Sequence, residues 1–430
     1  MFIYPNGATL SSIEVPPTFF TFVLTDTSGV KLYGGVLHIH ELVEPAEVRS
    51  LLEYVPTSSK FVYAPKALVV LSHYPFFHLF YNILKQLYRI SLSSCPLAME
   101  RYVAHVIQTT PLPPPGCTRV VFPLADSMMM VSRPPRNQLP MIDFSYRPLF
   151  TCLSVSNILT IFSFICAEHK VCFASKYLSI LTPVQESFLS FLFPLVWQGA
   201  YIPVMPATML DLLDAPVPML LGVERCQICE GKNLKPYYGG GVVIVDLDHD
   251  EVLVGCDDYG KALEPIHMQA KDLGKLKEKL VEFGGCIHKA RGSEENVEST
   301  LKAFPKNEHL QPIQSFASLE DGVKVPFIKD EQDDGVSVQS SFFFKEAESC
   351  SAPSLLSPES NGSTSAKDVF NAKEIRRAFL RFFVSSLRDM HSDNIRSDRS
   401  ESSCGDAGEK RKSINKRKNV PELSKFMTEL

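Results

Sequence analysis

The middle of this 430-residue chain contains a long stretch that is almost free of charged side chains. Residues 143–213 hold only seven, whereas Asp, Glu, Lys and Arg make up 21% of the whole chain. They are Asp143, Arg147, Glu168, Lys170, Lys176, Glu186 and Asp211. Because charged side chains are almost never fully buried, a stretch so depleted of them predicts the core of a large domain.

A membrane span is the alternative for Pro148–Ala167, which carries no charge. A span needs about 20 consecutive apolar residues, and this segment contains three serines and an asparagine. A second uncharged segment, Ser187–Leu210, is interrupted by Pro194, Pro203 and Pro206. We therefore expect a buried α/β core rather than a membrane span.

Segments of strand length and helix length alternate through this core. A strand is expected from Leu149, and helices at Ser156–Cys166 and Pro183–Leu195. Thr182 is the expected N-cap of the second helix, with Gln185 completing a capping box. The remaining expected elements are strands at Val171–Ala174, Tyr201–Met205, Leu220–Val223 and Val242–Leu247 and helices near Thr208–Leu213 and Leu273–Phe283. This alternation predicts an α/β fold with a mostly parallel sheet.

The N-terminal part predicts a separate unit. Strands at Phe19–Leu24 and Val30–His40 flank the turn Asp26–Gly29 and form a β-hairpin, with His38 and His40 on its exposed face. The elements expected next are a strand at Lys66–Ser72, a helix after Pro75 and a helix near Leu97–Gln108.

Proline and charge mark the remaining boundaries. The run PLPPPG at Pro111–Gly116 is a joint, followed by two short strands within Thr118–Ser132, where Met128–Met130 are expected to fill gaps in a core. Residues 291–366 are rich in Ser, Glu, Asp and Gly and predict a disordered linker. Lys373–Met390 predicts an amphipathic helix, and residues 391–430 predict a disordered, basic tail.

Motifs of catalysis are incomplete. The segment Gly255–Lys261 fits GxxxxGK, but Ala262 stands where a phosphate loop needs Ser or Thr, so a polar turn is expected. Cys226 and Cys229 form a CxxC without a second pair of ligands at zinc spacing. We expect no catalytic residue, cofactor or metal.

Composition limits the compartment and the partners. The net charge of −5 gives no overall basic surface for nucleic acid. The 11 scattered cysteines indicate reduced thiols in the cytoplasm, and the first residues lack the pattern of a signal peptide. The basic run at 410–418 is consistent with a solvated tail, a nuclear import signal or contact with anionic lipid.

Several segments together resemble the DENN domain. They are FTFVLTDTSGVKLYGG at 20–35, SHYPFFHLFYNILKQLYRI at 72–90, WQGAYIPVMP at 197–206, LLDAPVPMLLGV at 212–223 and KEIRRAFLRFFVSSLRDM at 373–390. The resemblance implies an upstream, longin-like module at 1–110, a joint at 111–140, a central module at 141–290 and the start of a downstream helical module at 367–390. Only the opening of the third module is matched, which leaves a fragment, a mispredicted gene product or a divergent member as alternatives.

The resemblance also implies a function. DENN proteins regulate Rab GTPases, mostly as guanine nucleotide exchange factors, so the expected partner is a Rab-type GTPase and the expected location is cytoplasmic, with peripheral contact to vesicles or endomembranes. Exchange needs a binding surface and no catalytic acid or base. Gln198, Tyr201, Asp211 and Asp214 are the residues we predict for that surface.

Both the four predicted surface residues and the chain as a whole have alternative interpretations. Tyr201 fits core packing, and the two aspartates fit ordinary surface charge at a helix end. The alternative function is that of an adaptor without exchange activity, or of a GTPase-activating partner that delivers an arginine such as Arg119, Arg133 or Arg136. A small-molecule hydrolase ranks last, because no nucleophile with a base is evident.

Overall fold

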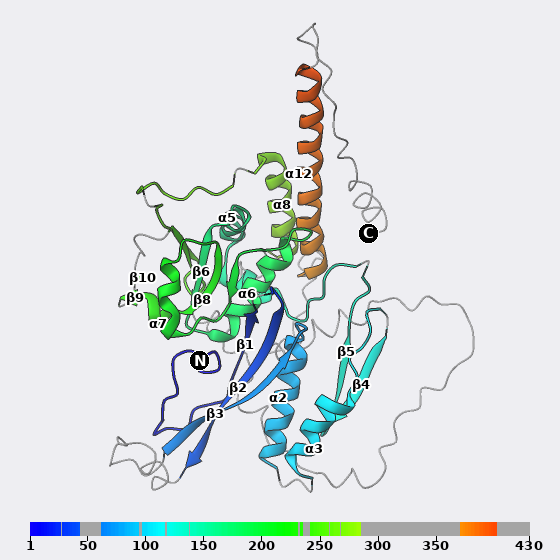
Figure 1. Ribbon diagram of the computed structural model, residues 1–430, viewed down its shortest axis with the longest axis vertical. Coiled ribbons are helices and arrows are strands. Elements are labelled where there is room, and N and C mark those ends of the chain that lie inside the picture. Colours follow the sequence, from blue (N-terminus) through cyan, green and yellow to red (C-terminus); the bar gives the residue numbers. More distant parts are fainter. Residues whose placement is uncertain are drawn as a thin grey trace, which may run out of the picture.

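The structure is a computed structural model, and Figure 1 shows how its parts are arranged. It describes residues 1–26, 28–43, 62–93, 97–116, 118–136, 138–230, 233–234, 241–257, 259–266, 268–284 and 370–401. Side chains are described only to residue 388 in the last range, and not for residues 229–230 and 233–234. The predicted linker at 291–366 and the part of the predicted tail after residue 401 lie outside the described residues.

The N-terminal lobe is built on an antiparallel sheet of order β1-β2-β3. Its strands are β1 (Thr18–Thr25), β2 (Lys31–Val43) and β3 (Val62–Ser72). The predicted hairpin is confirmed, with Leu24 paired to Leu32 at its closed end. Asp26 closes the turn, because its Oδ1 accepts hydrogen bonds from the backbone N–H groups of Ser28 and Val30 at 2.8 and 2.9 Å.

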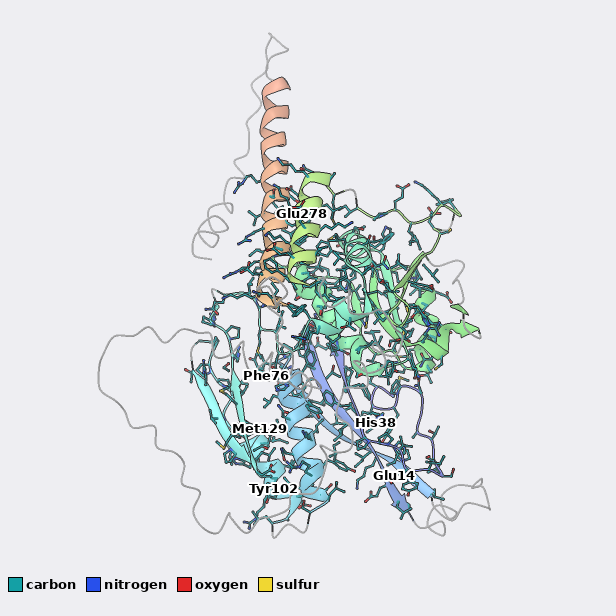
Figure 2. All side chains as sticks on the ribbon, turned by 180° about the vertical axis from the view of Figure 1, so that it is seen from behind. Glu14, His38, Phe76, Tyr102, Met129 and Glu278 are labelled. Atoms are coloured by element: carbon teal, nitrogen blue, oxygen red, sulfur yellow. The ribbon has the colours of Figure 1, made fainter. Side chains whose placement is uncertain are left out.

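Helices α2 and α3 and a two-stranded sheet complete this lobe. The helices are α2 (Phe77–Ser91) and α3 (Met99–Ala104), which ends in a π-helical turn at His105–Thr109, and the strands are β4 (Arg119–Leu124) and β5 (Ser127–Ser132). Phe76 and Met129 lie between α2 and the β4–β5 hairpin (Figure 2) and are 4% exposed. Met128 is instead 65% exposed, so the methionine run alternates along the strand rather than filling one core.

Asp143 joins the two lobes at the start of α2. Its Oδ2 accepts hydrogen bonds from the backbone N–H groups of His78 and Leu79 at 3.1 and 3.3 Å. These N–H groups have no partner inside the helix, and an aspartate is a preferred acceptor for them. Burial nevertheless raises the pKa of Asp143 to about 7.

We expect Asp143→Asn to change the pH dependence of stability. In the native protein the raised pKa means that the folded state holds a proton more tightly than the unfolded state, whose carboxyl titrates near 4. This contribution to stability is present below pH 4 and is lost as pH rises to about 7. Urea unfolding should therefore show that the free energy of unfolding falls more between pH 5 and pH 8 in the native protein than in Asp143→Asn. Equal falls would contradict the assignment. Burial also lowers the pKa of His78, but this residue is present in both proteins, so its contribution to the pH dependence cancels in the comparison.

The central lobe contains a five-stranded sheet of order β12-β11-β6-β8-β7. Its strands are β6 (Lys170–Ser175), β7 (Ala200–Ile202), β8 (Met219–Glu224), β11 (Val242–Asp246) and β12 (Glu251–Val254). All neighbouring pairs are parallel except β11 with β12, so the expected mostly parallel sheet is present. Every residue of β6 and β11 is buried, as expected for strands covered on both faces.

Helices surround this sheet, and short elements connect its strands. The helices are α4 (Arg147–Cys152), α5 (Val155–Cys166), α6 (Leu178–Phe191), α7 (Arg225–Ile228) and α8 (Ala270–Phe283), with a 3₁₀ helix at Ala207–Asp214. Two-residue strands β9 (Cys229–Glu230) and β10 (Asn233–Leu234) pair beside α7. The strand predicted from Leu149 is wrong, because Leu149 lies in α4 and is fully buried.

The predicted start of α6 is also wrong. The helix begins at Leu178, and Pro183 lies inside it. Thr182 is not an N-cap: its hydroxyl donates to the carbonyl oxygen of Thr21 at 2.5 Å. Ile180 and Leu181 are buried against the core, so tertiary packing extends the helix upstream of the proline, which lacks an N–H and ordinarily favours a helix start.

The C-terminal helix α12 (Ala372–Glu401) packs antiparallel beside α8 and projects beyond it (Figure 1). The N–H of Asn371 donates to the carbonyl oxygen of Phe283 at 3.1 Å, which joins the start of α12 to the end of α8. The predicted apolar face is buried at Ile375, Phe379, Phe382 and Phe383, but Leu387, which was predicted on the same face, is 44% exposed. The helix continues past residue 390, where the sequence predicts the tail to begin.

Candidate functional site

The two lobes meet along α6. Its hydroxyl-to-backbone contact with β1, Thr182 to Thr21, bridges residues 161 positions apart. Phe20 and Phe22 of β1 belong to the same buried cluster as Val184 and Phe188 of α6. The lobes therefore share one hydrophobic core, and any surface at their junction has a fixed geometry.

A cluster of three polar side chains lies at this junction. The Nζ of Lys31, from the start of β2, lies 4.9 Å from the centre of the Tyr201 ring in β7. The Tyr201 hydroxyl and the Glu186 carboxyl group of α6 are both buried and interact with each other. Burial raises the pKa of Glu186, although the Lys31 charge opposes it, and burial followed by the Glu186 charge raises the pKa of Tyr201.

The predicted site residues lie in two different environments. Tyr201 is only 3% exposed and belongs to the core between the lobes, so its side chain does not form part of the surface. Gln198 is exposed, and its amide donates to the carbonyl oxygen of Val196 at 3.2 Å. Asp211 and Asp214 are exposed on the 3₁₀ helix, and neither forms an ion pair with another residue in the part of the chain that the structure describes.

Gln198 borders an apolar surface that the sequence did not reveal. Val196 is 73% exposed, Leu195 52% and Val217 46%. The segments that carry them run side by side, because the N–H of Ala200 donates to the carbonyl oxygen of Pro218 at 3.1 Å. Exposed valine and leucine side chains gathered in this way are typical of protein interaction surfaces.

This surface lies where the parallel strands begin. The segments before β7 and β8 form it, and the aspartates join it because the amine of Lys170, at the start of β6, donates to the carbonyl oxygen of Leu213 at 2.7 Å. Val30, at the tip of the β1–β2 hairpin, is 48% exposed and precedes Lys31. We call this set the rim surface, defined by Val30, Leu195, Val196, Gln198, Asp211, Asp214 and Val217.

The opposite end of the sheet, where α/β proteins usually bind small ligands, is occupied by its own hydrogen bonds. Asp246 accepts from Nε of Arg225 and pairs with Nδ1 of His249, both at 2.9 Å. Asp248 accepts from the Ser175 hydroxyl and from the N–H of Lys176, both at 2.8 Å. These carboxylates hold the strand ends and turns together.

The segment that fits GxxxxGK is a turn. Cys256 and Ala262 pair as an antiparallel bridge, and Asp257 Oδ1 accepts from the N–H groups of Tyr259 and Lys261. The Lys261 amine pairs with Glu264 at 3.0 Å. A carboxylate thus takes the N–H groups that a phosphate loop directs to its ligand.

The histidine prediction for the hairpin is wrong. His38 and His40 are half-buried. The N-terminal segment covers His38: the Tyr4 ring stacks on it at 4.8 Å, and its Nε2 lies 2.5 Å from the carbonyl oxygen of Ile3. Cys226 of the CxxC is exposed on α7, whereas the side chain of Cys229 lies outside the described residues.

The described residues offer neither a metal cluster nor a membrane span. Among them, no group of three or more His, Cys, Asp and Glu side chains is arranged to hold a metal ion. No described helix has the length and hydrophobicity to cross a bilayer.

The fold defines the class of protein first: a two-lobed α/β protein. Comparisons with known proteins give the family. The DENN (AEX-3) domain pattern matches residues 63–250, and the uDENN domain pattern matches residues 1–39. The chain belongs to the DENN domain family. These proteins are regulators whose implied partners are small GTPases.

A curated relative supports this assignment. The chain is similar to the DENN domain and WD repeat-containing protein SCD1 of Arabidopsis thaliana, with 30% identity over 239 residues. The match covers 55% of this chain and 19% of the relative. The chain therefore corresponds to about a fifth of that protein.

Proposed function

We propose that this protein is a guanine nucleotide exchange factor for Rab-type small GTPases. The observation that carries the proposal is the rim surface. It combines exposed apolar side chains with two carboxylates that form no ion pair among the described residues, and it receives residues from both lobes of a DENN domain protein. In this proposal the first lobe is the longin-like module of residues 1–110, and the protein works in the cytoplasm, peripherally on a vesicle or endomembrane.

Exchange by a surface follows from linkage. A protein that binds the nucleotide-free GTPase more tightly than the loaded form lowers nucleotide affinity by the same factor. The rim surface offers valines for an apolar patch on the GTPase, and Asp211 and Asp214 for basic residues there. Because Lys31, Glu186 and Tyr201 fix β2 against α6 and β7, the two lobes present their parts of the surface together.

We expect the protein to accelerate release of fluorescent GDP from one or a few members of a panel of purified Rab GTPases. Asp211→Lys combined with Asp214→Lys should slow that release roughly tenfold or more, since like charges then oppose the partner. Val196→Asp should do the same by placing a charge in the apolar patch.

The matched control is Glu100→Lys combined with Glu278→Lys, which reverses two exposed carboxylates in α3 and α8. Its release rate should stay within about twofold of the native rate, with all melting temperatures unchanged. Full activity of the Asp211/Asp214 variant would contradict the rim assignment. Binding of a Rab without accelerated release would favour the adaptor instead.

A further inference from the structure

The outward face of α12 carries a row of basic side chains. Its members are Lys373, Arg377, Arg381 and Arg388. Spacings of four, four and seven residues place them on one side of a helix with 3.6 residues per turn. The buried residues Ile375, Phe379, Phe382 and Phe383 lie on the other side. We call this row the basic stripe.

Three of the four side chains of the basic stripe are exposed to solvent. Lys373, Arg381 and Arg388 are exposed, and Arg381 and Arg388 make no ion pair with another described residue. Arg377 pairs with Glu374 at 2.5 Å, the one acid on this part of the helix up to Arg388. The stripe spans about 22 Å, at 1.5 Å per residue.

The helix that carries the stripe is held firmly. Phe379 stacks on Phe191 of α6 with ring centres 4.1 Å apart. Arg376 points away from the stripe, and its guanidinium donates to the carbonyl oxygen of Pro140 at 2.7 Å. Figure 1 shows α12 rising beside α8 and extending past it, on the side of the molecule away from α3.

The charge of the chain is distributed unevenly around this helix. Residues 372–418 contain 13 Lys and Arg and 7 Asp and Glu, a net charge of +6, in a chain whose total is −5. The run KRKSINKRK at 410–418 belongs to this part. Such an asymmetry within one chain indicates a local anionic partner rather than a general requirement for solubility.

We propose that the basic stripe binds the surface of an anionic phospholipid bilayer. A straight row of long basic side chains on a convex helix matches a plane of phosphate groups, which can accept a contact at every turn. An acidic protein would have to present a complementary groove about 22 Å long to use the same row. Clustered Lys and Arg beside an anionic leaflet are attracted individually, and their contributions add.

The test is cosedimentation of the full chain with vesicles, in the absence of any GTPase. The native protein should bind vesicles of phosphatidylcholine with phosphatidylserine, lose binding as salt is raised, and ignore vesicles of phosphatidylcholine alone. Arg381→Gln combined with Arg388→Gln should lower the partition coefficient roughly tenfold or more. The control, Arg101→Gln with Arg136→Gln, removes two exposed charges elsewhere and should change it less than about twofold.

Three outcomes would overturn the proposal. One is equal binding by the stripe variant and the native protein. Another is loss of binding only when the basic residues at 410–418 are changed to Gln, which would assign the contact to that run. The third is no binding to anionic vesicles together with binding to polyglutamate, which would favour an acidic protein. Because the assay contains no GTPase, none of these results bears on nucleotide exchange.

Discussion

Phe379→Ala should lower the free energy of unfolding by about 3–5 kcal/mol, the range for deletion of a buried aromatic ring. Phe379 is 1% exposed. Its ring stacks on Phe191 of α6 and meets Phe162 of α5 edge to face at 4.9 Å. Both partners are themselves buried in the central lobe, so the cavity left by alanine has rigid walls.

Urea unfolding followed by circular dichroism measures this loss. The control is Leu387→Ala on the same helix, where the side chain is 44% exposed and the expected loss is below about 1 kcal/mol. If Phe379→Ala also costs less than about 1 kcal/mol, α12 does not contribute to the core as described. Protease digestion of the native state adds a local test, because an undocked α12 should be cut first.

Gly222→Ala is expected to destabilise the protein by about 3 kcal/mol or more, the upper end of the range for overpacking. Gly222 lies in β8, and its carbonyl oxygen accepts from the N–H of Met205 at 2.7 Å. A Cβ added here would overlap with the backbone carbonyl of Pro203. Gln185 donates to that carbonyl at 3.0 Å and is buried, so the neighbours cannot move aside.

The control is Gly274→Ala in α8, where an added Cβ would meet nothing within 4 Å. Alanine is the better helix former by about 1 kcal/mol, so this variant should be slightly more stable than the native protein. Differential scanning calorimetry would compare the two. A melting temperature for Gly222→Ala close to the native value would show that β7 and β8 can separate without cost.

Local patterns allowed much of the fold to be predicted. The β1–β2 hairpin followed from a turn and alternation within about 20 residues, and the parallel sheet followed from alternating strands and helices. The early start of α6 could not be predicted, because Thr182 and Pro183 favour a helix start and only the burial of Ile180 and Leu181 against distant elements overrides that preference.

The candidate site was predicted only in part. Asp211 and Asp214 are charged residues in an apolar segment, so their exposure was predictable. The burial of Tyr201 was one of the two alternatives for this residue, but its contact with Lys31 could not be predicted, because Lys31 is 170 positions away in the sequence. The exposure of Val196 and Val217 was not predicted, because a valine in an apolar run has the same sequence pattern whether it faces the core or solvent.

The bond between Thr182 and Thr21 has a consequence for synthesis of the chain. The first strand is synthesised early, yet Phe20 and Phe22 can pack against α6 only after α6 has been synthesised, and Thr182 follows Thr21 by 161 residues. At about 5–20 residues per second, the ribosome needs roughly 8–32 s to add them. We expect the apolar face of the hairpin to be open during that interval, when a chaperone has time to bind it.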